Sequence, residues 1–323
     1  MMAPYLLRLL CLSLAVFFTI HFAVGLLVML TGRPMVRVVR RLRPSIAARW
    51  LLAVRMLPTA LSLLVVGGIC VPSYLWLEPE LSGEEIGVGC LVGASLGAAL
   101  WILSVSRGLR GVMRASRHSR DCMRLGRPTE LAGFRMPIWV LDTQAPLFAL
   151  VGVFRSGVVL SDVVLNRLTS AQLGAALRHE EAHLHARDNL KRLVLLLTPG
   201  LLPGFHGFQE IERGWARFIE WSADDEAVAG DDRRSLSLAA ALVRMARLGG
   251  SAAAPLTAAF ASDCGEVTAR VDRLLSPVPA APLPEVRPAM VAAAVAVVAG
   301  LVAGMLHPST LSYAHRIIEE VIH

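Results

Sequence analysis

Four long apolar stretches divide the chain, at residues 9–30, 56–77, 86–106 and 288–306. About 20 consecutive apolar residues cross the hydrocarbon core of a bilayer as one helix. The pattern therefore predicts four transmembrane helices, three of them within residues 1–106. A signal peptide is the competing interpretation of the first stretch, but the stretch is longer than the apolar part of a signal peptide and no clear small-x-small cleavage site follows it.

The polar segments between these stretches differ in charge. Residues 32–50 hold several arginines and no acidic residue, whereas residues 78–85 are acidic and rich in turn-forming residues. Short loops with an excess of Lys and Arg stay in the cytoplasm. We therefore expect a multi-pass protein of the cell membrane, with residues 107–287 as a cytoplasmic domain and residues 307–323 as a short external tail.

A run of arginines follows the third stretch. From Arg107 to Arg127 they recur every three or four residues, which places them on one face of a helix. The third helix is thus expected to continue beyond the membrane with a basic stripe. Two interpretations remain open for this stripe: a solvated face that fixes topology, or a surface that binds anionic lipid head groups.

Composition supports a membrane protein. Hydrophobic residues make up 55% of the 323 residues and charged residues only 18%. The formal net charge of +7 would indicate a nucleic-acid partner in a soluble chain. Here the arginines lie beside apolar runs, so membrane lipids are the expected partners and direct nucleic-acid binding is not expected. The spacing of the cysteines indicates neither a disulfide framework nor a zinc site.

Shorter elements are predicted in the domain. Alternating and apolar segments indicate strands at Met136–Leu141, Leu147–Val151 and Gly157–Leu160, the last two joined as a hairpin. Thr169 and Gln172 then form a capping box, which marks the start of a helix. A small sheet therefore precedes a helix.

That helix carries the pattern H-E-x-x-H at residues 179–183. Two histidines four residues apart lie on the same helical face, so His179 and His183 can both reach one metal ion. Zinc suits neutral imidazole ligands and keeps one coordination position open for water in catalytic sites. Glu180 can then act as the general base that takes the proton of the water. For the five-residue pattern alone, a solvated turn of helix is the alternative.

A third ligand is needed for such a site, and residues 214–229 offer one on a predicted helix. Glu220 and Asp224 are again four residues apart. Glu220 can bind the metal while Asp224 accepts the free N–H of a ligating histidine. One Zn²⁺ per chain is therefore expected. Asp188 either supports the site or is a solvated residue near the middle of a helix.

These motifs together resemble the BlaR/MecR-type membrane metallopeptidases of the gluzincin type. The resemblance rests on Phe148-Ala149-x-x-Gly152, on the H-E-x-x-H helix followed by Arg187-Asp188, and on E-x-x-x-D at Glu220; residues 270–275 also resemble the R-x-x-R-L segment that closes such domains. It implies four transmembrane helices and a mainly α, α+β zinc protease domain in the cytoplasmic loop. It also implies a protein or peptide substrate, and a transcriptional repressor is one such target.

The resemblance leaves two other functions open. HtpX-like quality-control peptidases share both zinc motifs, although they place membrane spans between them, where this chain has only the short apolar run 193–202. A non-catalytic receptor scaffold is the third possibility, which the complete ligand set argues against. Family receptors carry an external penicillin-binding sensor after the fourth span, so β-lactam sensing is not expected with only a short tail there.

Substrate contacts are predicted at the strand before the helix. Peptidases of this type align an extended substrate along a sheet edge by main-chain pairing, and the nearest strand comprises Leu147, Phe148, Ala149, Leu150 and Val151. An interior position for this strand is the alternative. His206 is a candidate for stabilising the oxyanion, whereas His185 is expected to point away from the metal.

Overall fold

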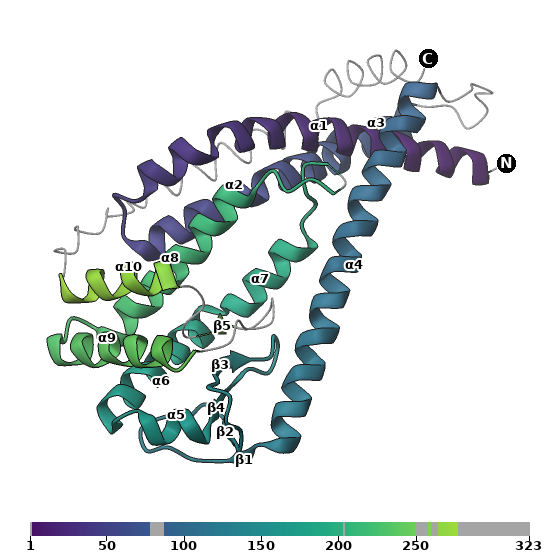
Figure 1. Cartoon of the computed structure of the whole chain (residues 1–323). Helices are drawn as coiled ribbons and strands as arrows, with labels where there is room; N and C mark the ends of the chain where they lie inside the picture. The colour runs from purple at the N-terminus through teal and green to yellow at the C-terminus, as the bar shows by residue number, and fades with distance from the viewer. Residues whose placement is uncertain (1, 78–86, 203, 250–257, 260–263, 277–323) are drawn as a thin grey trace.

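The computed structural model describes residues 2–77, 87–202, 204–249, 258–259 and 264–276. The predicted fourth transmembrane helix, the external tail and the acidic hairpin lie outside these residues. Within them the protein is mostly helical, with one small mixed sheet. Helix α1 crosses the top of the molecule above α2 and α8, and α4 descends from α1 to the sheet (Figure 1).

Three segments of the described chain are long and apolar enough to cross a membrane. They are Tyr5–Val39 in α1 (Met2–Val39), Pro44–Leu77 and Val88–Leu125, which is α4. The second consists of α2 (Pro44–Val65), the π-helical turn η1 (Val66–Cys70) and α3 (Val71–Leu77). These helices agree with the first three predicted spans and with a membrane protein.

The helices extend further than the apolar runs predicted. At a rise of 1.5 Å per residue, the 38 residues of α4 span about 57 Å, nearly twice the ~30 Å hydrocarbon core. The arginine-rich segment 32–50, expected as a loop, is helical except for the turn between Val39 and Pro44. Arginine is a good helix former, so a run of arginines after an apolar stretch does not end the helix. The continuation of the third helix beyond residue 106 is confirmed.

The sheet has the strand order β1-β2-β4-β3-β5. Its members are β1 (Arg127–Pro128), β2 (Ile138–Leu141), β3 (Phe148–Val151), β4 (Gly157–Ser161) and β5 (Ala258–Ala259). Strands β3 and β4 form the predicted antiparallel hairpin, while β2 pairs parallel to β4. Strand β3 lies between β4 and β5 in the described sheet, so the prediction that it forms an edge was wrong and the interior alternative was right.

Helices cover both faces of this sheet. On one face Ile138, Phe148 and Leu160 pack in a core with α6 (Ser170–Ala186), α9 (Asp232–Arg247) and α10 (Cys264–Leu275). On the other face Trp139 and Val159 contact Cys122 near the end of α4. This division follows the alternation of side chains along a strand. The sheet is therefore held between the membrane-helix α4 and the domain helices, beside the short α5 (Asp162–Arg167).

The remaining domain helices pack against the membrane helices. Helix α7 (Asp188–Leu197) lies against α4, and α8 (Gln209–Val228) lies against α2. At Gly214, which has no side chain, Val36 and Leu51 approach α8 closely. The domain is thus joined to the three apolar helices by shared hydrophobic cores rather than by a linker alone.

Candidate metal centre

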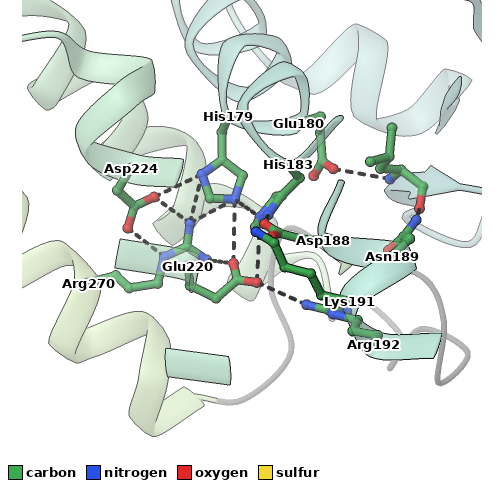
Figure 2. A network of polar contacts seen from close by, with 11 residues as sticks. His179, Glu180, His183, Asp188, Asn189, Lys191, Arg192, Glu220, Asp224 and Arg270 are labelled. Carbon is green, nitrogen blue, oxygen red and sulfur yellow. Dashed lines mark hydrogen bonds and ion pairs between the residues drawn. The ribbon is translucent and has the colours of Figure 1, made fainter. Parts of the chain in front are cut away.

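Two histidines from α6 and one glutamate from α8 converge inside the domain. The capping box predicted at Thr169 and Gln172 starts α6, and His179 and His183 follow on its buried face. Glu220 comes from α8, which begins five residues before the predicted start at 214. One ligand atom of each of the three residues lies within 4.8 Å of the others, an arrangement that could hold a metal ion (Figure 2).

The three side chains approach one another closely enough to share one metal ion. The Nε2 atoms of His179 and His183 are 3.1 Å apart, and they lie 3.4 Å and 3.5 Å from the two oxygens of Glu220. Ligands at the usual 2.0–2.1 Å from a tetrahedral zinc are about 3.3 Å from one another. Each histidine therefore lies at such a distance from one of the two Glu220 oxygens, and the three residues could hold a metal ion together.

Carboxylates hold both imidazoles in one orientation. Nδ1 of His179 lies 3.0 Å from Asp224, and Nδ1 of His183 lies 2.8 Å from Asp188. With the Nδ1 protons donated to these carboxylates, the Nε2 lone pairs face the common point. The sequence predicted this arrangement for Asp224 and left it open for Asp188.

A break in the helix brings Asp188 to the site. Helix α6 ends at Ala186, and Arg187 takes the left-handed conformation with φ of 55°. Such a conformation costs a residue with a side chain about 1–2 kcal/mol. Asp188 then begins α7, where its side chain is buried and reaches back to His183. It is therefore not a solvated residue in mid-helix.

The buried charges favour a cation between the histidines. Burial opposes a positive charge on His183, but Glu220 and Asp188 outweigh it and raise its pKa to about 10. Burial would also raise the pKa of Glu220, yet His183 and His179 hold it well below its usual value. A proton or a metal ion can meet this demand for positive charge.

Arg270 is the part of the site to which the sequence assigned no role. It comes from α10 within the R-x-x-R-L segment, and its guanidinium contacts Asp224 at 2.6 and 2.9 Å and Glu220 at 3.2 Å. Burial works against ionisation of Asp224, but Arg270 and His179 lower its pKa to about 2. Arg270 thus favours the ionised form of Asp224 and adds to the effect of the histidines on Glu220. The pattern of the segment was the only sign of it in the sequence.

Glu180 lies beside the histidines and faces strand β3. One oxygen, Oε2, accepts the backbone N–H of Leu150 at 3.1 Å, while Oε1 is buried and has no hydrogen-bond partner among the described residues. Burial raises the pKa of Glu180, opposed by the two histidines. Asn189, which the sequence did not indicate, donates to the carbonyl oxygens of Leu150 and Gly152. Leu150 therefore stands next to the candidate base.

The other predicted site residues lie at different distances from this centre. His206 is exposed before α8, and within the described residues no hydrogen bond or ion pair joins it to the three ligand candidates. His185 is exposed and points to Glu226, as expected. On β3, Phe148, Ala149, Leu150 and Val151 are all buried, and β5 pairs with Ala149 and Leu150.

Comparison with known proteins gives one family. No curated protein shows significant similarity to the chain. Residues 125–260 match the family model of peptidase family M48, whose members are metallopeptidases. The match covers β1 to β5, including both the H-E-x-x-H helix and Glu220. Together with the convergent His-His-Glu group, it supports a metallopeptidase domain of the M48 family in this membrane-helix protein.

Proposed function

We propose that the protein is a membrane zinc endopeptidase in which His179, His183 and Glu220 bind Zn²⁺. The observation that carries this proposal is the convergence of two Nε2 atoms and a carboxylate within 4.8 Å of one another, with a buried oxygen of Glu180 alongside that has no hydrogen-bond partner among the described residues. Zinc, when bound, would polarise the scissile carbonyl and lower the pKa of a water at the site.

The chain's own residues supply the remaining steps. Glu180 Oε1 accepts the proton of the attacking water and transfers it to the amine that leaves. Its other oxygen is held by Leu150, so the carboxylate is fixed in direction before substrate arrives. Asp188 and Asp224 keep the histidines in the tautomer that binds metal. Asn189 fixes β3 beside the site through the carbonyl oxygens of Leu150 and Gly152.

Substrate binding along β3 belongs to the same proposal. A peptide would add to Leu147–Val151 as an extended strand, with Leu150 next to Glu180. In the described sheet β5 pairs with Ala149 and Leu150 on the side of β3 that faces away from β4. A substrate strand at these two residues would therefore replace β5.

The plan of the chain favours a BlaR/MecR-type peptidase over an HtpX-like one. Between the two zinc motifs the structure has α7, whose 10 residues span about 15 Å and cannot cross a bilayer. The arginines after the first and third spans support a cytoplasmic domain. The proposed substrate is thus a cytoplasmic or membrane protein, with a regulatory repressor as the leading class. Reporter fusions at residue 130 test the orientation, and an external position there would overturn it.

The catalytic proposal is tested with protein purified in detergent. We expect stoichiometric zinc in the wild type and in Glu180→Ala, with casein cleavage lost in that variant alone. Glu181→Ala is the matched control, because it removes the same charge from the next position of α6 without touching the site. Absence of zinc from the wild type, or casein cleavage by Glu180→Ala at the wild-type rate, would overturn the proposal.

A further inference from the structure

A pocket of about 370 Å³ lies between the membrane helices and the metal centre. Helices α2, α4, α7, α8 and α10 all contribute to it, and its lining residues are Arg55, Arg107, Arg192, Leu195, Leu196, Glu212, Trp215, Ala216, Glu220 and Glu266. Its size is that of a small ligand pocket in proteins. The arginines come from three different helices, so the fold gathers them at this place.

Arg55 is the most deeply buried of these residues. Its side chain is 4% exposed; Nε donates to Glu212 at 2.7 Å and Nη2 to the carbonyl oxygens of Thr198 and Pro199. Nη1 is buried without a hydrogen-bond partner among the described residues. A buried donor of a charged group that makes no hydrogen bond is costly. An acceptor that reached Nη1 from the pocket, after a small movement of the side chain, would remove that cost.

Arg107 repeats this situation from α4. Its Nη2 donates to Ser104 and to the carbonyl oxygen of Thr198, while its Nε is buried and unpartnered in the described chain. Two arginines from different membrane helices thus each keep an unused N–H at one pocket. Arginine N–H groups bind carboxylates with good geometry.

The acidic residues of the lining do not satisfy these donors. Glu212 is engaged by Arg55, and Glu220 by the histidines and Arg270. Glu266 is the third acid, on α10, and in the described chain it forms no hydrogen bond or ion pair with Arg55 or Arg107. The buried N–H groups of Arg55 and Arg107 therefore find no acceptor among the acidic residues of the lining.

Glu220 connects the pocket to the metal centre. Arg192 reaches Glu220 Oε1 at 3.5 Å from the α7 side, while Arg270 approaches the same carboxylate from the other side (Figure 2). That oxygen is in turn 3.5 Å from Nε2 of His183. The pocket therefore begins one side chain away from the place where the scissile bond would lie.

We propose that this pocket binds a carboxylate of the substrate and so selects peptides with an acidic group near the scissile bond. The inference rests on the proposed peptidase function. Arg55 and Arg107 would bind the carboxylate, while Leu195, Leu196 and Trp215 contact the carbon chain that carries it. Two sources supply this chemistry, an Asp or Glu side chain within the substrate or the α-carboxylate at its C-terminus.

Peptide binding tests this without turnover. The probes are fluorescent ten-residue peptides of otherwise neutral sequence, with a single Glu placed at a different position in each. Every peptide has a counterpart with Gln in place of Glu, and both are made with a free and with an amidated C-terminus. Affinities are measured on zinc-loaded Glu180→Ala protein in detergent. We expect the peptide with Glu at one position to bind about tenfold tighter than the Gln peptide, or the peptide with a free C-terminus to bind about tenfold tighter than the amidated one. This is the size of effect expected for a hydrogen-bonded charge.

Variants connect the preference to the pocket. In the Glu180→Ala background, Arg107→Gln should lower the ratio of the affinity for the acidic peptide to that for its neutral counterpart at least fivefold. Arg114→Gln, an exposed arginine on the same helix, should leave the ratio unchanged. If the affinity depends on the position of Glu, the pocket binds a side-chain carboxylate. If it depends on amidation of the C-terminus, the pocket binds the α-carboxylate. Ratios near one throughout, no binding of any peptide, or equal effects of both variants would overturn the proposal.

Two further outcomes are informative. The protein could prefer phosphatidylglycerol vesicles to neutral vesicles, lose this preference in Arg107→Gln, and show no preference among the peptides. That result would overturn the substrate site in favour of a lipid site. If the wild type fails to cleave every peptide while the affinity ratio persists in the binding assay, the carboxylate pocket stands and the peptidase proposal fails. The two proposals can therefore fail separately.

Discussion

Replacing Asp188 should weaken zinc binding without unfolding the domain. Asp188 is 3% exposed, and its Oδ2 accepts the Nδ1–H of His183 at 2.8 Å. This bond fixes the tautomer that leaves Nε2 free for the metal, and the negative charge makes the imidazole a stronger ligand. Loss of such a partner costs 10–100-fold in metal affinity, or about 1.4–2.8 kcal/mol.

Two substitutions, Asp188→Asn and Asp188→Ala, separate the effect of the negative charge from that of the hydrogen bond. Asp188→Asn keeps an oxygen that can accept the proton of His183 but removes the charge, so we expect a loss near tenfold. Asp188→Ala removes both, and we expect a loss near a hundredfold. Lys191 also loses its 2.8 Å contact with Asp188, but its side chain is 35% exposed and water can replace that contact.

Zinc affinity is measured by competition with a chelator on protein purified in detergent. Asp162→Asn is the matched control, because Asp162 is also the first residue of a helix and also pairs with a basic residue, Arg127. It therefore loses the same favourable charge at a helix N-terminus without affecting a histidine. The reasoning is refuted if Asp188→Ala binds zinc within twofold of the wild type, or if Asp162→Asn shows the same loss.

Three other predictions follow from buried contacts. Arg270→Gln should lower the unfolding free energy of zinc-free protein by about 3 kcal/mol, because Asp224 loses its buried cationic partner Arg270. Denaturation is measured with and without zinc, and zinc should restore part of the lost stability. Asp224 has a pKa of about 2 against 3.8 for an unperturbed aspartate, so its contribution of about 2 kcal/mol to stability is present above pH 4 and is lost as pH falls towards 2. Acid denaturation curves of Asp224→Asn should lack this loss. Gly97→Ala would place Cβ 2.5 Å from the carbonyl oxygen of Leu14 and should cost about 1–3 kcal/mol in thermal unfolding, whereas Gly89→Ala, with nothing within 4 Å, should not.

The parts of the fold that depend on neighbouring residues could be predicted from the sequence. The capping box at Thr169 and Gln172 and the hairpin of β3 and β4 are local, and both were found where predicted. Strand β5 was not predicted, because it pairs with β3 from more than a hundred residues away. The prediction that β3 forms an edge failed for the same reason, because the position of a strand in a sheet depends on pairing with strands that are distant in the sequence.

The candidate site divides in the same way. The spacing of His179 and His183 fixes their common helical face, so their convergence could be predicted. Arg270 contacts Asp224 across 46 residues, and no local pattern indicates that contact. The position of Asp188 depends on a left-handed residue that is not glycine, so the sequence offered no sign of the turn that directs it to His183.

The buried charges suggest why metal and general base belong to one unit. The pKa values of Asp188, Glu220 and Asp224 around the histidines are all lowered, and the guanidinium of Arg270 lies buried among them. Burial at the same time raises the pKa of Glu180, which favours its protonated form. A divalent cation at the His-His-Glu group would act against this by stabilising the carboxylate nearby. Metal binding would therefore supply charge balance and also bring Glu180 into the ionised state that a general base requires.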